Sequence, residues 1–381
     1  MDRRMSKSFN IPLQTLLIFL LLLAIGSWLA AKKPLWNDEA YSQVNSIQRL
    51  SYTHILIGRV PEGNVCPLFY LIQKLIGNAA NYALPVPWDG KPIVDTRAQW
   101  IFRIAPDLCM SLAMALIFYF FARFYSWWWG FYALMMSLSS FMVWAYWVEA
   151  RPYALWFLLT TAQLLALIKL LANPDRRALW SSLTICHFLL GLTVIFAIVQ
   201  IAIVSFLLWI FKQKDRKKYI LASWLPMAIG LYYYSQAPKY TFWLDKPLWG
   251  LIDLNLPSDI LWIAGIYALF CAVYRRKSIR RPTDGWVCLL LMAMMAGAAL
   301  ALIAGMTRGH HPREGFELTF RYFIFLTPLG IIAATVFAKD LTAAFQKDWW
   351  AVAMTVIVLG GLLIIRCLKA YMLILGWYAF P

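Results

Sequence analysis

The sequence has little charge, few histidines and no ordered pattern of cysteines. Asp, Glu, Lys and Arg make up 14% of its 381 residues, and it contains four histidines. The six cysteines show no CxxC or CxxH spacing, so they support neither a zinc site nor a disulfide framework. Internal repeats are not evident, so the inverted-repeat pattern of many transporters is missing. We also expect no carboxyl-terminal soluble domain.

Hydrophobic residues dominate the chain. They make up 62% of it, and the mean hydropathy is +0.64. Apolar runs of about 20 residues, the length of a bilayer-spanning helix, recur throughout. We therefore predict an all-α polytopic integral membrane protein in which residues 1–381 form a single transmembrane domain. The eleven predicted spans are 11–31, 100–121, 127–147, 152–171, 179–196, 197–211, 218–236, 257–274, 286–306, 320–338 and 349–372.

The net charge of +17 comes from basic residues in short connections between the apolar runs. This placement is typical of cytoplasmic loops and argues against nucleic-acid binding. We predict a cytoplasmic amino terminus, an outer carboxyl terminus, and a first run that is retained because it is longer than a typical signal core. The basic residues of the predicted cytoplasmic connections are Arg123, Lys169, Arg176, Arg177, Lys212, Lys214, Arg216, Lys217, Lys218, Arg275, Arg276, Lys277, Arg280, Arg281, Lys339 and Lys347.

The longest predicted non-spanning segment is the first outer loop, residues 32–99. Residues 67–76 within it are apolar and amphipathic but too few to span, so we predict an interfacial helix. The loop opens with two adjacent carboxylates, Asp38 and Glu39. On this topology every glutamate of the chain falls on the outer side, where we therefore expect chemistry. The glutamates are Glu39, Glu62, Glu149, Glu314 and Glu317.

Two further charged pairs lie at the predicted outer ends of spans. Glu149 and Arg151 occupy the turn before Pro152, a residue that suits the start of a helix. They can form an ion pair that closes a helical hairpin, or they can join the carboxylates of the first loop in a shared site. Arg103 and Asp107 have i, i+4 spacing and can pair on one helix face. A structural role and a functional role both stay open for them.

The late part of the chain adds cations on the same predicted side. Adjacent His310 and His311 do not share a helix face and make a poor metal clamp by themselves. Arg321, which precedes Tyr322, is the better candidate for an anion contact. Arg366 and Lys369 in the last span either snorkel or face an anionic lipid head group. Additional positive charge on the outer side comes from Lys239 and Lys246, with Tyr240 beside them.

Carboxylates suit general-base chemistry on a hydroxyl, and fixed cations suit a departing phosphate. At these residues the chain resembles membrane glycosyltransferases of the GT-C class. More closely, it resembles the bacterial branch related to protein O-mannosyltransferases and to the aminoarabinose transferase of lipid A. The resemblance covers most of the length in order, on short motifs. These are Asp38-Glu39-Ala40-Tyr41, Pro67-Leu68-Phe69-Tyr70, Arg103, Glu149-x-Arg151-Pro152-Tyr153 and Arg321-Tyr322.

The resemblance implies transfer of a sugar, with inversion, from a polyprenyl-phosphate donor to a glycan, lipid or protein acceptor. The reaction would occur on the periplasmic face of a bacterial inner membrane. By position, Asp38 would be the general base, Glu39 would orient it or the acceptor, and Glu149 would shape the pocket. The other candidate binding residues are Arg103, Arg151, Arg321, Tyr41, Tyr153, Lys239, Tyr240, Tyr322 and His310. A divalent cation at the carboxylates, Mg²⁺ or Mn²⁺, stays open.

Two segments depart from the family pattern. The family often has His-Pro-Pro where this chain has Val65-Cys66-Pro67, and Thr-His-Tyr where it has Thr193-Val194-Ile195-Phe196. If that second histidine contacts the donor, this protein holds its donor differently or uses another lipid carrier.

Two other functions compete with this interpretation. A related polymerase or ligase would use diphosphate-linked glycans and usually relies on arginines in a large late outer loop, whereas loop 307–319 is short. A transporter or lipid flippase would place ionisable residues near mid-bilayer and interrupt its helices. Most charges here gather at one face, and Asp107 is the main exception.

Overall fold

The computed structural model describes residues 10–85, 90–173, 175–211, 216–237, 255–274, 284–307, 320–344, 357, 360–368 and 371–372. Within them the secondary structure is helical, apart from an isolated antiparallel bridge between Leu35 and Ile93. The all-α prediction is therefore confirmed for the described part of the chain.

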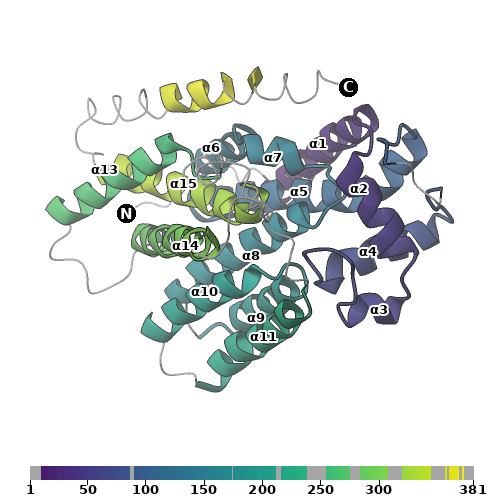
Figure 1. Cartoon of the computed structure of the whole chain (residues 1–381). Helices are drawn as coiled ribbons and strands as arrows, with labels where there is room; N and C mark the ends of the chain where they lie inside the picture. The colour runs from purple at the N-terminus through teal and green to yellow at the C-terminus, as the bar shows by residue number, and fades with distance from the viewer. Residues whose placement is uncertain are drawn as a thin grey trace.

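Five helices are long and apolar enough to cross a membrane. Each of them overlaps a predicted span, and α8 lies in the middle of the bundle, where it packs against α5 and α15 (Figure 1). Length and composition thus support a helical membrane protein. The five helices are α1 (Ile11–Lys32), α5 (Thr96–Phe124), α8 (Tyr153–Ala172), α14 (Asp284–Thr307) and α15 (Leu326–Ala344).

The other predicted spans that the structure describes are also helices, but they are shorter, interrupted or less apolar. They are α6 (Trp127–Leu138) with α7 (Phe141–Tyr146), α9 (Arg177–Gly191), α10 (Ala197–Phe211), α11 (Arg216–Gln236) and α13 (Ser258–Tyr274). Two predicted boundaries were wrong: the segment 127–147 breaks at 139–140, and the helix predicted for 179–196 ends at Gly191. The predicted span 349–372 lies mostly outside the described residues. The count of eleven spans stays a prediction.

The first loop contains four short helical elements, which gather on the right-hand side of Figure 1. The helix predicted at 67–76 is confirmed as α4, and the main-chain N–H of Leu68 donates to Leu192 O at 2.9 Å. On its other side, Lys74 Nζ donates to the carbonyl of Ile47 at 2.8 Å. These bonds tie the loop to the bundle and to itself. The elements are α2 (Asn37–Tyr41), the π-helix η1 (Ser42–Gln48), α3 (Tyr52–Leu56) and α4 (Pro67–Ala79).

Arg321 and Tyr322 lie in a 3-10 turn, η2 (Phe320–Phe323), and not inside a long helix as predicted for 320–338. Helix α15 begins only at Leu326, and Pro328 lies in its first turn, where a missing N–H costs no helical hydrogen bond. The turn therefore leaves the two side chains at the end of the bundle.

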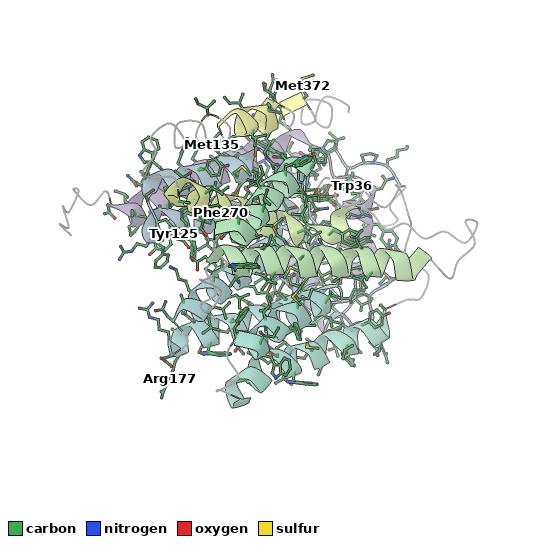
Figure 2. All side chains as sticks on the ribbon, turned by 90° about the vertical axis from the view of Figure 1, so that its left-hand side faces the viewer. Trp36, Tyr125, Met135, Arg177, Phe270 and Met372 are labelled. Atoms are coloured by element: carbon green, nitrogen blue, oxygen red, sulfur yellow. The ribbon has the colours of Figure 1, made fainter. Side chains whose placement is uncertain are left out.

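Connections predicted on opposite sides of the membrane lie at opposite sides of the molecule. Figure 2 shows Tyr125 and Arg177, from predicted cytoplasmic connections, on the left and Trp36, which follows the first span, on the right. The direction of this arrangement relative to the cell stays a prediction.

Two prolines inside helices each free a carbonyl group, and a side chain from another element bonds to it. Pro106 in α5 cannot donate to Phe102 O, which instead accepts from Gln73 Nε2 at 2.8 Å. Pro226 in α11 cannot donate to Ala222 O, which is bonded to Nδ1 of the buried His187 at 2.6 Å. Because an unbonded carbonyl is costly in an apolar interior, these bonds let the helices bend without an orphaned group.

Asp107 does not pair with Arg103, in contrast to the pairing that their spacing allowed. Its carboxylate accepts hydrogen bonds from Ser27 Oγ at 3.0 Å, Ser111 Oγ at 3.1 Å and Trp147 Nε1 at 3.1 Å. Three donors from α1, α5 and the segment after α7 thus satisfy the buried carboxylate. Arg103 pairs instead with a different acidic residue, Glu39.

Arg366 neither snorkels nor faces a lipid head group. Its guanidinium binds both carboxylate oxygens of Asp259 at 2.9 and 2.8 Å, and its Nε donates to Ser139 Oγ at 3.1 Å. The ion pair with Asp259 neutralises the charge of Arg366, for which the sequence had suggested no acidic partner. Lys369 lies outside the described residues.

Gly26 allows α1 to approach the Asp107 cluster, and its substitution tests that approach. A Cβ at Gly26 would overlap the Asp107 carboxylate and lie 2.6 Å from Trp147 Nε1. We expect Gly26→Ala to destabilise the protein by about 1–3 kcal/mol and to lower the thermal unfolding midpoint in detergent. Gly265→Ala is the control, because a Cβ there meets nothing within 4 Å. Equal midpoints for the two variants would contradict the packing.

The role of Gln73 can be isolated by a double-mutant cycle. We expect Gln73→Leu to cost about 1–3 kcal/mol, because the Phe102 carbonyl loses its donor. In a Pro106→Ala background the new N–H can bond to that carbonyl, so the cost of Gln73→Leu should fall. Chemical denaturation in detergent gives the four stabilities. The same cost in both backgrounds would show that Gln73 does not act through the carbonyl.

Candidate active site

Helix α2 follows α1 after a short connection and directs its two carboxylates differently. Glu39 Oε2 accepts from the main-chain N–H of Trp36 at 3.1 Å, which satisfies one donor at the start of the helix. Neighbouring helical residues point about 100° apart. Glu39 therefore faces the bundle, whereas Asp38 faces the end of the molecule where η2 lies.

Glu39 and Arg103 form a bidentate ion pair in which both side chains are 0% exposed. Arg103 Nε donates to Oε1 at 3.1 Å, and a terminal nitrogen donates to Oε2 at 2.6 Å. Glu39 Oε1 also accepts from the N–H of Ala150 at 2.6 Å. The remaining N–H groups of Arg103 bind the carbonyls at the end of α1, those of Ala30, Lys33 and Pro34.

This pairing explains which of the open roles Arg103 fills. A guanidinium has five N–H groups, and the five contacts of Arg103 account for all of them. No donor is left for a phosphate, so the geometry favours the structural role. Glu39 is likewise saturated, which suits holding the site together better than accepting a proton.

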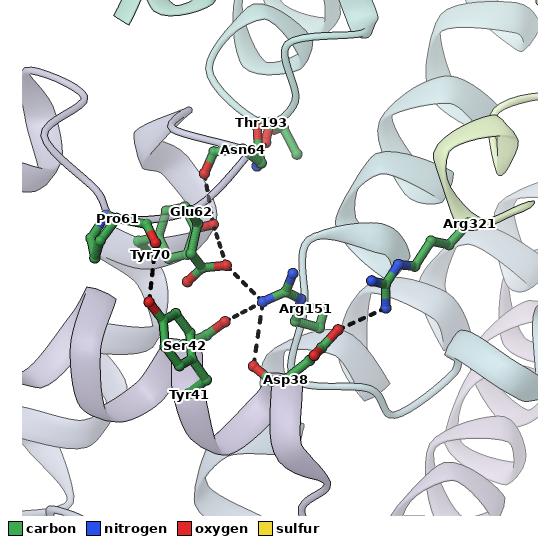
Figure 3. Close-up of polar contacts among 10 residues, drawn as sticks. All are labelled: Asp38, Tyr41, Ser42, Pro61, Glu62, Asn64, Tyr70, Arg151, Thr193 and Arg321. Carbon is green, nitrogen blue, oxygen red and sulfur yellow. Dashed lines mark hydrogen bonds and ion pairs between the residues drawn. The ribbon is translucent and has the colours of Figure 1, made fainter. Parts of the chain in front are cut away.

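Asp38 pairs with Arg321, a residue 283 positions later in the chain. Oδ2 lies 2.9 Å from a terminal nitrogen of Arg321, and the Asp38 side chain is 35% exposed while that of Arg321 is 16% exposed. Figure 3 shows Asp38 between the guanidinium groups of Arg321 and Arg151. The structure thus brings together Asp38 and Arg321, which sequence reasoning had placed only on the same side of the membrane.

The hairpin interpretation had expected an ion pair between Arg151 and Glu149. Arg151 instead binds residues of the first loop. One terminal nitrogen of Arg151 contacts Glu62 Oε2 at 2.7 Å, the main-chain oxygen of Asp38 at 3.3 Å and the Ser42 hydroxyl (Figure 3). Burial alone would lower the pKa of Arg151, but the carboxylate of Glu62 and nearby phenols outweigh it and raise that pKa. The turn is therefore anchored to α2 and η1.

Sequence reasoning assigned no role to Glu62, Tyr70, Ser42 or Lys33. Glu62 Oε2 also accepts from the Tyr70 hydroxyl at 3.2 Å, so it joins α4 to Arg151. The sequence marked Glu62 only as one of the five glutamates on the predicted outer side, and Tyr70 only as the last residue of the motif Pro67-Leu68-Phe69-Tyr70. Burial lowers the pKa of Lys33, although the charges of Glu149 and Glu39 oppose this effect. Lys33 had no motif to mark it.

Glu149 is the most isolated acidic group of the site. Glu149 is 3% exposed, and its Oε1 has no hydrogen-bond partner among the described residues. Burial raises its pKa to about 7, with Glu39 acting in the same direction and the cations Lys33, Arg321 and Arg151 acting against it. A carboxyl group of this kind can exchange a proton near neutral pH.

Several buried polar atoms near these contacts lack a partner in the part of the chain that the structure describes. They include both donors and acceptors, which suits a ligand that carries an anionic group together with hydroxyls. The atoms are Trp36 Nε1, Glu62 Oε1, Glu149 Oε1, Arg151 Nε and Arg321 Nε.

Three predicted aromatic residues have different positions. Tyr153 is buried and packs edge-on against Tyr146, with ring centroids 4.9 Å apart. Tyr322 packs against Phe196 at 5.5 Å. Tyr41 is exposed, and its hydroxyl donates to Pro61 O at 3.4 Å. Lys239, Tyr240, Lys246, His310 and His311 lie outside the described residues.

The two segments that depart from the family pattern lie against each other. Asn64 Nδ2 donates to Thr193 O at 2.9 Å, and Asn64 Oδ1 accepts from Ile195 N at 3.3 Å. Cys66 and Ile195 belong to one small buried cluster with Val65 and Tyr233. An apolar contact therefore occupies the place where both departures meet.

The carboxylates of α2 do not fit a shared divalent cation. Both oxygens of Glu39 already accept from Arg103, and Asp38 pairs with Arg321. No group of three or more His, Cys, Asp or Glu side chains with metal-binding geometry occurs among the described residues. The guanidinium groups provide the positive charge here.

In comparisons with known proteins, no family model and no curated protein sequence matches this chain. The resemblance to GT-C glycosyltransferases therefore stays a prediction that rests on short motifs.

The raised pKa of Glu149 predicts a pH-dependent effect of Glu149→Gln. Between about pH 4.5, the ordinary pKa, and about pH 7, the folded protein keeps the proton that the unfolded chain has lost. Wild-type stability should therefore fall relative to the Gln variant as pH rises through this window, by about 3 kcal/mol in total. Thermal unfolding of both proteins in detergent across pH 4–8 measures it. A difference that stays constant with pH would contradict the assignment.

Proposed function

We propose that this protein is an inverting glycosyltransferase. It moves a sugar from a polyprenyl-phosphate donor to an acceptor hydroxyl on the outer face of a bacterial inner membrane. The observation that carries the proposal is the contact of Asp38 with Arg321, beside Arg151. A partly exposed carboxylate next to two guanidinium groups provides a base and an anion-binding pair at one place.

The proposed reaction is a single displacement at the anomeric carbon. Asp38 accepts the proton of the acceptor hydroxyl, and the acceptor oxygen forms the new bond to the anomeric carbon. The bond from that carbon to the phosphate oxygen breaks, and its electron pair leaves with polyprenyl phosphate. Arg321 and Arg151 stabilise the negative charge that develops on the phosphate. Attack opposite the leaving group inverts the configuration.

The remaining residues support this reaction from different positions. In this proposal Glu149 binds a hydroxyl of the sugar or of the acceptor, which is supported by its buried Oε1 that has no partner among the described residues. Glu39 and Arg103 hold α2 in place and do not contact the substrate in this proposal. No step is assigned to a metal ion, because Arg103 occupies the oxygens of Glu39.

A transporter or lipid flippase is the second candidate. It is favoured by the buried Asp107 inside α5 and by the interruption between α6 and α7. The hydrogen bonds to Asp107 from Ser27, Ser111 and Trp147 count against an ion pathway, because they already engage both carboxylate oxygens.

Donor turnover tests the transferase proposal. The purified protein is incubated with a panel of polyprenyl-phosphate sugars, and the release of free polyprenyl phosphate is followed. We expect Asp38→Asn to lower turnover by about 10²–10⁴-fold, because the amide cannot accept the proton. Asp175→Asn is the matched control, because Asp175 is exposed in the turn between α8 and α9.

Full turnover by a folded Asp38→Asn variant would remove Asp38 from the mechanism. If the wild type neither consumes nor is thermally stabilised by any donor of the panel, the transferase proposal fails and transport becomes the leading candidate.

A further inference from the structure

Arg321 is held mainly by aromatic rings. Its guanidinium carbon lies 5.8 Å from the ring centroid of Trp36, 5.9 Å from that of Tyr153 and 5.8 Å from that of Tyr322. Aromatic faces attract a cation through the ring quadrupole, and they offer no oxygen or nitrogen acceptor to its N–H groups. Arg321 is thus fixed in position while its hydrogen-bonding capacity is largely preserved.

The donors of Arg321 contrast with those of Arg103. All five N–H groups of Arg103 are engaged, whereas Nε of Arg321 is buried without a partner among the described residues. Among these residues Asp38 is the carboxylate that forms an ion pair with Arg321. Arg321, unlike Arg103, therefore keeps a donor with which it can bind a further anion.

Asp38 can leave Arg321 without moving its own helix. The main-chain oxygen of Asp38 is held by Arg151 at 3.3 Å, and α2 is capped by Glu39. Only the side chain, the more exposed member of the pair, has to rotate. Because the Asp38 side chain is 35% exposed, it can turn towards solvent while another anion takes its place on Arg321.

We propose that Asp38 and the donor phosphate compete for Arg321, so that donor binding releases the Asp38 carboxylate from its ion pair. This inference rests on the proposed function and adds an order of events, in which the donor binds before the acceptor is deprotonated. Without donor, Arg321 holds the carboxylate. With donor, the phosphate oxygens take the guanidinium, and the Asp38 carboxylate is then free to bind the acceptor hydroxyl. The acceptor hydroxyl is then deprotonated only when a donor is present.

The competition predicts opposite effects of Asp38→Asn on turnover and on binding. The variant lacks the competing charge, so it should bind polyprenyl phosphate about two- to tenfold more tightly than wild type while turnover is lost. Equilibrium titration of the detergent-solubilised full chain with polyprenyl phosphate measures the affinity. Asp175→Asn controls for the loss of an acidic charge elsewhere and should leave the affinity unchanged.

A double-mutant cycle shows whether the effect passes through Arg321. Arg321→Gln should weaken binding, and Asp38→Asn should give little gain in the Arg321→Gln background. A similar gain in both backgrounds would mean that Asp38 repels the phosphate from a distance, and the competition would be overturned. Equal or weaker binding by Asp38→Asn alone would overturn it as well.

The outcomes separate this inference from the proposed function. Tighter binding by Asp38→Asn through Arg321, with no sugar donor turned over by wild type, would support the competition and remove the transferase. Turnover by wild type without tighter binding by Asp38→Asn would support the transferase and overturn the competition. If polyprenyl phosphate binds neither wild type nor Asp38→Asn, and wild type neither consumes nor is stabilised by any donor, both proposals fail.

Discussion

A carboxylate and a guanidinium without solvent exposure, Glu39 and Arg103, join the segments that meet at one end of the bundle. The pair joins the end of α1, the start of α2, the first third of α5 and the main-chain N–H of Ala150 before α8. Removing one member would leave a buried charge unpaired, which costs about 3–5 kcal/mol in other proteins. The relative position of Asp38 and Arg151 depends on this pair, because it orients both segments that carry them.

The adjacent carboxylates of α2 illustrate how one helical turn separates structure from chemistry. Glu39 points into the bundle and is saturated, whereas Asp38 points towards η2 and stays partly exposed. The same division recurs in the arginines, since Arg103 uses every donor and Arg321 does not. Groups that stabilise the protein are satisfied by the protein, and the groups proposed for substrate retain free capacity.

Several polar groups within the apolar bundle form hydrogen bonds to neighbouring elements. Gln73 and His187 bond to carbonyls that Pro106 and Pro226 set free, and three donors satisfy Asp107. In a low-dielectric interior an unpaired polar group is expensive, so each irregularity is compensated by a neighbouring element. Glu149 Oε1 is one of several buried side-chain atoms that have no partner among the described residues, and it is the one that belongs to an acidic group with a raised pKa.

The sequence by itself determined the helical class and the positions of most helices. It also determined which charged residues gather at one end of the bundle. These features depend on local apolar runs and on residue type, which do not require knowledge of distant partners. Only the tertiary structure decided that Arg321 meets Asp38, that Arg151 pairs with Glu62 and that Arg103 is used up in holding α2. These pairings depend on side-chain direction and on segments far apart in the chain. Spacing along the chain does not encode them, because the bundle brings together residues whose separation in sequence is unrelated to their distance in space.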